Sequence, residues 1–270
     1  MTPNGIKRIW EDGGAAINGW LSIASPFSAE IMAAQGYDSL TVDLQHGVVD
    51  YAQAVTMLQA ARASGATPMA RVPWLDPGII MKMLDAGAYG IICPMINDRA
   101  EAETLVEAMR YPPRGARSFG PTRAAVVAGA DYATRADDEV LCFAMIETER
   151  GVANLEEIVA TPGLDGVYIG PADLTIGVTR GRLPPGFDRE EEEMIAVIER
   201  IRATAHGAGI KAALHCGAPD YAARAIGWGF DLVTLLNDAR LLASAAAASV
   251  GRTRELLGRE RGPGSSSTSY

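Results

Sequence analysis

Two acidic residues stand out because each follows a short apolar run at the point where the chain turns. Glu147 follows Leu141 to Ile146, and Asp173 follows Gly166 to Ile169 one repeat later. Such runs predict buried strands. Ligands of parallel α/β proteins bind at the carboxyl ends of the strands, so two carboxylates there predict a site for Mg²⁺, Mn²⁺ or Co²⁺. Alternatively, Asp173 caps the following helix and Glu147 is a solvated loop residue.

Three further polar residues are candidates for the same strand ends. His46 and Arg71 come at the ends of the second and third predicted strands. Asp85, in the next predicted helix, could reach back to orient a histidine. A buried guanidinium needs an anion, so Arg71 is expected to face Glu147 or a ligand carboxylate. A lone histidine is more often structural, but the position of His46 after a strand favours a functional role.

The positions of the lysines argue against a mechanism in which a lysine amine forms a Schiff base with the substrate. An enzyme that forms a Schiff base with its substrate needs a lysine amine in the site. The chain has only Lys7, Lys82 and Lys211, which are predicted before the first strand, in a helix, and at the start of a strand, away from its carboxyl end. Enolate chemistry at this site would therefore have to be stabilised by a metal and Arg71.

Eight apolar runs alternate with helix-like stretches, several of which end in a glycine. This repeat predicts a (β/α)8 TIM barrel. A doubly wound sheet is the alternative, but the segment after the first strand lacks the glycine-rich turn that such a sheet would need. The predicted strands are 16–23, 39–42, 67–72, 90–93, 141–146, 166–169, 210–214 and 232–235.

Composition restricts the partners. The net charge of −9 and the absence of a basic run argue against nucleic acid and anionic membranes, which leaves small metabolites. No apolar run approaches the roughly 20 residues of a membrane span. Three scattered cysteines fit reduced thiols in the cytoplasm. We expect one domain, residues 1–260, and a disordered polar tail, residues 261–270.

Two long connections are candidates for covering the site. Residues 111–139 contain a Pro/Gly-rich stretch, and residues 176–189 directly follow Asp173. Long loops in compact domains are usually functional. We expect both segments to lie over the barrel mouth, where they would shape substrate access.

The candidate residues belong to short motifs that resemble the HpcH/HpaI family of metal-dependent pyruvate aldolases from about residue 18 to residue 242. The motifs are Val42-Asp-Leu-Gln-His-Gly47, Ala70-Arg-Val-Pro73, Leu84-Asp-Ala-Gly87, Pro94-Met95, Arg110-Tyr-Pro-Pro-Arg-Gly115, Ile146-Glu-Thr148 and Ile169-Gly-Pro-Ala-Asp-Leu174. The resemblance implies a barrel whose C-terminal helix is exchanged between subunits of a homohexamer, a trimer of dimers. It also implies class II aldol chemistry on a 2-oxoacid and an aldehyde, with a divalent metal and no organic cofactor.

The resemblance also implies a role for each candidate residue. Glu147 and Asp173 would be the metal ligands, and Arg71 would stabilise the enolate oxygen. His46, oriented by Asp85, would act as general base. The resemblance further implies that the substrate is bound by Arg71, Gly170, Ala172, Asp173 and Leu214, with the backbone N–H groups of Ala172 and Asp173 receiving its carboxylate.

Two positions depart from the family pattern and leave the donor open between pyruvate and hydroxypyruvate. Met145 stands where the family often has glutamine, and Gln45 where it often has glutamic acid. Alternative functions on the same scaffold are a citryl- or malyl-CoA-type lyase and an oxaloacetate decarboxylase. A non-catalytic binding barrel would be expected to lack the polar residues at the mouth, which are intact here.

Overall fold

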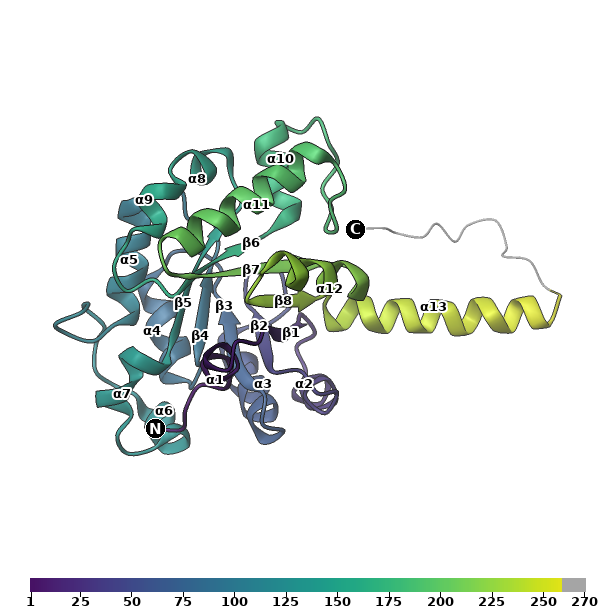
Figure 1. Cartoon of the computed structure of the whole chain (residues 1–270). Coiled ribbons are helices and arrows are strands. Elements are labelled where there is room, and N and C mark those ends of the chain that lie inside the picture. Colours follow the sequence, from purple (N-terminus) through teal and green to yellow (C-terminus); the bar gives the residue numbers. More distant parts are fainter. Residues whose placement is uncertain (259–270) are drawn as a thin grey trace.

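The structure, a computed structural model, describes residues 1–258 and contains a closed barrel of eight parallel strands in sequence order (Figure 1). The barrel prediction is confirmed. The predicted tail at 261–270 and the domain boundary at 260 lie outside the described residues. The strands are β1 (Ala16–Leu21), β2 (Ser39–Asp43), β3 (Thr67–Arg71), β4 (Gly90–Cys93), β5 (Leu141–Ile146), β6 (Gly166–Ile169), β7 (Lys211–Cys216) and β8 (Leu232–Leu235).

Helices surround the barrel, and several begin at a side chain that caps the first turn. Asp50, for example, accepts a hydrogen bond from the backbone N–H of Gln53, and the side chain of Gln53 accepts one from the backbone N–H of Asp50. The helices are α1 (Gly5–Glu11), α2 (Pro26–Ala33), α3 (Tyr51–Ala63), α4 (Pro77–Asp85), α5 (Arg99–Met109), α6 (Thr122–Ala128), α7 (Tyr132–Glu139), α8 (Glu149–Ala153), α9 (Leu155–Val159), α10 (Pro171–Thr179), α11 (Glu192–Gly207), α12 (Pro219–Trp228) and α13 (Asp238–Leu256).

The strands separate two apolar layers because their side chains alternate between the inside and the outside of the barrel. The inner layer includes Trp20, Phe143 and Tyr168, whereas the larger outer layer lies between strands and helices. Helix α1 closes the amino end of the barrel, where Ile6 joins the inner layer and Trp10 packs edge-on against Phe143. The polar site is therefore confined to the opposite, carboxyl end.

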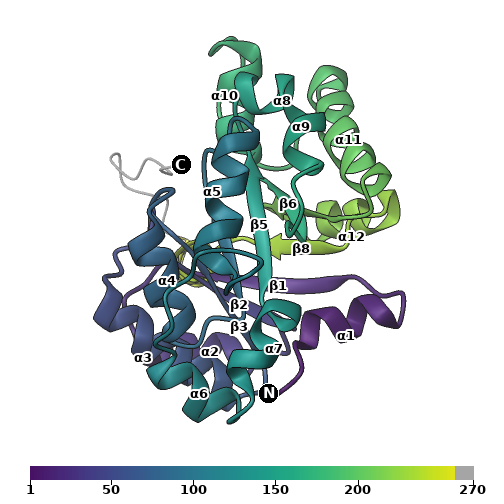
Figure 2. The same cartoon turned by 90° about the vertical axis from the view of Figure 1, so that its left-hand side faces the viewer.

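The long connection 111–139 does not cover the barrel mouth, so this prediction was wrong. It forms α6 and α7 at the amino end of the barrel, near the chain's N-terminus (Figure 2). The backbone N–H of Thr2 donates to the carbonyl of Ala128, and α7 leads directly into β5. The segment comes after a helix and before a strand, and in a (β/α)8 barrel such connections lie at the amino end.

The connection after β6 does lie at the mouth, as predicted. Helix α10 occupies its first part, and Phe187 from its last part stacks on His215 of β7 with ring centroids 4.8 Å apart. The predicted cover at 176–189 thus contributes an aromatic wall to the carboxyl end of the barrel.

The last helix, α13, projects away from the barrel (Figure 1). Asp238 at its start is its one buried residue, whereas Leu242, Val250 and Leu256 are exposed. Within residues 1–258, no helix combines the length and the apolar character that a membrane crossing would need.

Candidate active site

A cavity of about 440 Å³ opens at the carboxyl ends of the strands. It brings together five of the predicted site residues: His46, Arg71, Gly170, Ala172 and Asp173. These come from three different βα units, those of β2, β3 and β6, as expected for a barrel mouth. The full lining is Trp20, Ser22, Ile23, Asp43, His46, Val48, Arg71, Met145, Gly170, Ala172, Asp173, Phe187, His215, Asn237 and Ala239.

The anion that faces Arg71 is Asp43, which corrects the expectation of Glu147 or a ligand carboxylate. Arg71 donates from Nε to Asp43 Oδ1 at 2.9 Å and from Nη2 to Oδ2 at 2.6 Å. The two residues are register partners on the neighbouring strands β2 and β3. Such a two-point pair fixes the plane of the guanidinium. The remaining N–H groups of Arg71 are left for the cavity.

The Asp43 carboxylate also ties the loop of His46 to the barrel. It accepts the indole N–H of Trp20 at 3.1 Å and the backbone N–H groups of Gln45 and His46 at 3.0 and 3.3 Å. Burial raises the pKa of Asp43. The hydrogen bonds that Arg71 donates and its positive charge lower the pKa by more, so it lies below its usual value. Asp43 is thus ionised and positions both Arg71 and His46.

Glu147 is almost fully buried beside this cavity. Its Oε1 accepts the backbone N–H of Met95 at 2.8 Å. Burial raises the pKa of Glu147 to about 7, and the charge of Asp173 contributes in the same direction. The two predicted metal ligands follow neighbouring strands, because β5 pairs with β6 and their last residues Ile146 and Ile169 are register partners. A buried carboxylate beside another carboxylate calls for a cation.

Gly170 provides the space that Glu147 occupies. A Cβ atom at this position would lie 2.5 Å from Glu147 Oε2 and would also collide with Met145.

Among residues 1–258, no group of three or more His, Cys, Asp and Glu side chains is arranged to hold a metal ion. The oxygen pair Glu147 and Asp173 fits a divalent ion that takes its remaining ligands from substrate and water.

Helix α10 directs its amino end towards the cavity. It begins at Pro171 after Gly170, and no side chain caps its first turn. The first N–H groups of a helix have no intrahelical acceptor, so those of Ala172 and Asp173 are available to an anion. This geometry suits a substrate carboxylate next to the Glu147 and Asp173 pair.

Asp85 is not brought to His46 within this chain. It is the last residue of α4, and its carboxylate pairs with Arg117 at 2.7 Å. Helices of the barrel return from the mouth to the amino end, so their last residues lie far from the site. The orientation of His46 by Asp85 therefore finds no support in the single chain.

Leu214 is likewise not part of the cavity lining. Its side chain is buried in the outer apolar layer, between the strands and the helices. The next residue, His215, points into the barrel and lines the cavity. Strand β7 continues two residues beyond its predicted end, and alternation along the strand puts His215 inside. Sequence reasoning also left out Trp20 and Phe187, two further lining residues.

Comparisons with known proteins agree with this geometry. The HpcH/HpaI aldolase/citrate lyase family model matches residues 17–245. The chain belongs to this family. It is 42% identical to a hydroxypyruvate/pyruvate aldolase of Rhizorhabdus wittichii over 94% of this chain and all of that protein. It is 32% identical to a 5-keto-4-deoxy-D-glucarate aldolase of Shigella dysenteriae over 90% of this chain and 94% of that protein.

Solved structures of the HpcH/HpaI family have the same fold. A Burkholderia cenocepacia member is 29% identical and superposes with a TM-score of 0.84 over 93% of this chain and 99% of that one. Together with the named relatives, this membership makes the chain an aldolase.

The lysines of this HpcH/HpaI aldolase are all remote from the cavity. Lys7 and Lys211 pair with Asp165 and Asp231, and Lys82 lies over the ring of Tyr51. None of the three lysines lines the site. The positions of the three lysines agree with the expectation from the sequence that none is placed to form an imine at this cavity.

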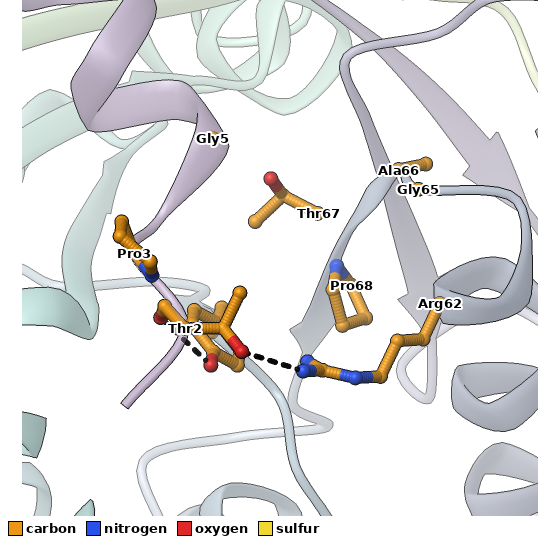
Figure 3. Close-up of a pocket in the computed structure, with 9 residues that line it drawn as sticks. Thr2, Pro3, Gly5, Arg62, Gly65, Ala66, Thr67 and Pro68 are labelled. Carbon is orange, nitrogen blue, oxygen red and sulfur yellow. Dashed lines mark hydrogen bonds between the residues drawn. The ribbon is translucent and has the colours of Figure 1, made fainter. Parts of the chain in front are cut away.

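A smaller cavity of about 170 Å³ lies at the amino end of the barrel, where Arg62 donates to the hydroxyl of Thr2 at 3.2 Å (Figure 3). Gly5, Pro68 and Tyr89 also line it, and its described lining includes no carboxylate or histidine. Features at this end of a barrel serve stability rather than catalysis. The cavity at the carboxyl end is therefore the active-site candidate of this family member.

Gly170→Ala is expected to weaken metal binding by about tenfold or more, because its Cβ would displace the Glu147 carboxylate. The measurement is a calorimetric Mg²⁺ titration of chelator-treated protein. Gly207→Ala is the matched control, since a Cβ there meets nothing within 4 Å. Equal affinities for the Gly170→Ala variant and the wild type would show that Gly170 is not needed to seat Glu147.

Proposed function

We propose that this aldolase catalyses the reversible, metal-dependent addition of the enolate of hydroxypyruvate or pyruvate to an aldehyde. The observation that carries the proposal is the meeting of Arg71, Asp173 and the helix α10 terminus in one cavity beside the buried Glu147. Relatives named hydroxypyruvate/pyruvate aldolase support the choice of donor. The physiological aldehyde is not part of the proposal.

Glu147 and Asp173 would hold the divalent ion. Use of such an ion is a general property of the family. A bound Mg²⁺, Mn²⁺ or Co²⁺ would supply Lewis-acid polarisation of the 2-oxo group. No organic cofactor is required by this scheme, since the enolate charge is met by the ion and by Arg71.

Arg71 would stabilise the charge that develops on the 2-oxo oxygen as a proton leaves C3. Its plane is fixed by Asp43 before substrate arrives, so the donor groups need no reorganisation in the transition state. The amino end of α10 would hold the substrate carboxylate through the N–H groups of Ala172 and Asp173.

His46 would move the proton at C3 and at the aldol hydroxyl. Its side chain is exposed at the cavity, and the backbone N–H of His46 is fixed by Asp43. Asp85 could assist it only from a neighbouring subunit, because within one chain Asp85 pairs with Arg117.

We further propose that α13 is exchanged between subunits of a homohexamer. The support is its projection from the barrel with Leu242, Val250 and Leu256 exposed. Light scattering of the full chain tests this proposal, and a monomer would contradict it. A cytoplasmic location is consistent with Cys93 and Cys142, which are buried free thiols.

Aldol addition tests the proposed reaction. The chelator-treated protein is mixed with hydroxypyruvate or pyruvate and a panel of aldehydes, with and without added Mg²⁺, Mn²⁺ or Co²⁺. We expect a 4-hydroxy-2-oxoacid product, identified by mass spectrometry, only when metal is present. Product formation at an undiminished rate after complete metal removal would refute the proposal.

Metal affinity should depend on pH because Glu147 must lose its proton to bind an ion. The pKa of Glu147 is raised to about 7, so the carboxyl is neutral below pH 7 in the metal-free protein. We expect the apparent Mg²⁺ affinity to fall about tenfold for each pH unit below 7 and to level off above it. Calorimetric titrations from pH 5.5 to 8.5 measure this; a flat profile between pH 5.5 and 7 would argue against Glu147 as a ligand.

A further inference from the structure

His215 ends a chain of buried polar groups that runs through the inside of the barrel. Its Nδ1 lies 3.1 Å from the hydroxyl of Tyr168, which lies 2.7 Å from the hydroxyl of Thr234. Thr234 in turn accepts the side-chain N–H of Asn18 at 2.9 Å. Tyr168, Thr234 and Asn18 are fully shielded from solvent. Buried polar groups of this kind need partners for every proton, so the direction of each bond can be deduced.

The orientation of Asn18 fixes one end of the chain. Its Oδ1 lies 2.8 Å from the hydroxyl of Ser39 and 3.1 Å from that of Thr41. Both hydroxyls can donate to an oxygen there. A flipped amide would leave both of their protons without an acceptor among the described residues. Asn18 therefore presents its N–H group to Thr234.

The proton of Thr234 then has one acceptor within reach, the oxygen of Tyr168. Either hydroxyl of a pair 2.7 Å apart can donate, but Thr234 already accepts from Asn18 and has no other described acceptor. Donation from Thr234 to Tyr168 directs the proton of Tyr168 to Nδ1 of His215. An Nδ1 that accepts places the imidazole proton on Nε2.

The Nε2 edge of His215 is left open to the active-site cavity. This atom makes no hydrogen bond to a described residue and is not sealed from the cavity. Phe187 stacks on the ring at 4.8 Å and 22°, and Trp20 packs edge-on at 4.9 Å. Burial lowers the pKa of His215 to about 3, with the charge of Arg71 acting in the same direction, so the ring stays neutral. The cavity thus contains a fixed, uncharged N–H donor.

This N–H donor lies close to Arg71, which would hold the 2-oxoacid in the proposed function. The Trp20 ring contacts both groups, with the Arg71 guanidinium 4.8 Å from its centroid and His215 at its edge. Phe187 stacks on the His215 ring and Trp20 packs against it, so the ring is held between the two. The reactant expected to meet Nε2 is therefore the donor that Arg71 would hold beside Trp20.

We propose that His215 is a specificity-determining residue whose Nε2–H binds the C3 hydroxyl of a 3-hydroxy-2-oxoacid and favours this donor over pyruvate. The inference rests on the proposed function of the cavity. Pyruvate has a methyl group at C3 and leaves the N–H without a substrate partner. A site that hydrogen-bonds a substrate hydroxyl discriminates against the analogue that lacks it.

Two substitutions at His215 separate the hydrogen bond from packing. His215→Phe keeps an aromatic ring against Phe187 but removes the donor. His215→Gln places an amide N–H near the position of Nε2. The measurement is kcat/KM for Mg²⁺-dependent exchange of the C3 protons of hydroxypyruvate and of pyruvate in D2O, corrected for exchange without enzyme. Thermal unfolding of each variant checks the fold.

We expect His215→Phe to lower the hydroxypyruvate to pyruvate ratio of kcat/KM by about tenfold, with the larger loss on hydroxypyruvate. His215→Gln is expected to keep the ratio within about threefold of the wild type. Tyr168→Phe, which removes the bond that fixes the imidazole proton, should lower the ratio by about threefold. It serves as the test if His215→Phe does not fold.

Several outcomes would overturn the inference. An unchanged ratio in His215→Phe, or an equal loss for both donors, would make His215 a packing residue while the proposed function stands. An unchanged ratio in Tyr168→Phe would refute the hydrogen-bond direction deduced above. If the wild type exchanges neither donor with metal present, the proposed function fails and the inference fails with it.

Discussion

Replacing Glu147 with glutamine is expected to reduce metal-dependent aldol activity to background while the barrel stays folded. The amide keeps the shape of the side chain but loses the negative charge that a divalent ion requires. The fold should tolerate the change because burial already raises the pKa of Glu147 to about 7. Activity is measured as a function of Mg²⁺ concentration, and metal binding and thermal unfolding are measured on the same samples.

Glu149→Gln is the matched control for this prediction. Glu149 lies two residues away, is exposed, and pairs with Arg180 at 2.7 Å. Exposed pairs of this kind contribute little to stability, so the control should bind Mg²⁺ and turn over like the wild type. Full activity in Glu147→Gln at the same metal concentration would remove Glu147 from the metal site and leave the account without its main ligand.

Arg71→Lys is expected to lower kcat by about 10²-fold or more with a smaller effect on KM. Arg71 commits Nε and Nη2 to Asp43 and still has N–H groups to offer to the cavity. A lysine ammonium keeps the charge beside Asp43, so the buried carboxylate is not left unpaired. The ammonium group has no planar set of N–H donors, so it cannot bind Asp43 and the enolate oxygen at the same time. Stabilisation of the enolate oxygen should therefore be lost.

Arg200→Lys is the matched control, because it replaces an arginine by a lysine in an ion pair on the surface, where Arg200 pairs with Glu156. This variant should match the wild type in both kcat and KM. Steady-state rates of aldol addition at saturating Mg²⁺ give the comparison. If Arg71→Lys kept the wild-type kcat, the fixed guanidinium would have no part in charge stabilisation and only a positive charge would be needed there.

Much of the barrel and part of its site can be predicted from the sequence because both depend on local patterns. Apolar runs of strand length gave four of the eight strands with correct bounds and the others within two residues. Residues in the first turn after those runs, such as Asp173, reach the mouth by the geometry of the fold. The positive backbone φ of Gly36 and Gly65 likewise agrees with the helix ends predicted there.

The misplaced connection 111–139 and the separation of Asp85 from His46 within one chain have the same physical cause. Residues 111–139 and Asp85 both come at or after the end of a helix, and such positions lie at the amino end of a barrel. Pro/Gly content and distance from the predicted strands say nothing about which end a connection occupies. The order of helix and strand along the chain does indicate which end of the barrel a connection occupies. The sequence therefore contained the information needed to place both features.

Other features depend on contacts between distant segments. Asp43 faces Arg71 because β2 and β3 pair in a particular register, which a single sequence does not specify. The predicted end of β7 fell one residue before His215, so the sequence did not place this side chain inside the barrel. Its partners Tyr168 and Thr234 come from two other strands, and only the closed barrel brings them together.

Exchange of the methyl protons of pyruvate in D2O is the most direct test of enolate formation at the Glu147 and Asp173 site. The chelator-treated wild type and Glu147→Gln are incubated with pyruvate, with and without Mg²⁺, Mn²⁺ or Co²⁺, and deuterium uptake is followed by mass spectrometry. The account predicts rapid uptake for the wild type with metal, and background uptake without metal or in the variant. Equal uptake by both proteins, or uptake by the wild type without metal, would contradict it.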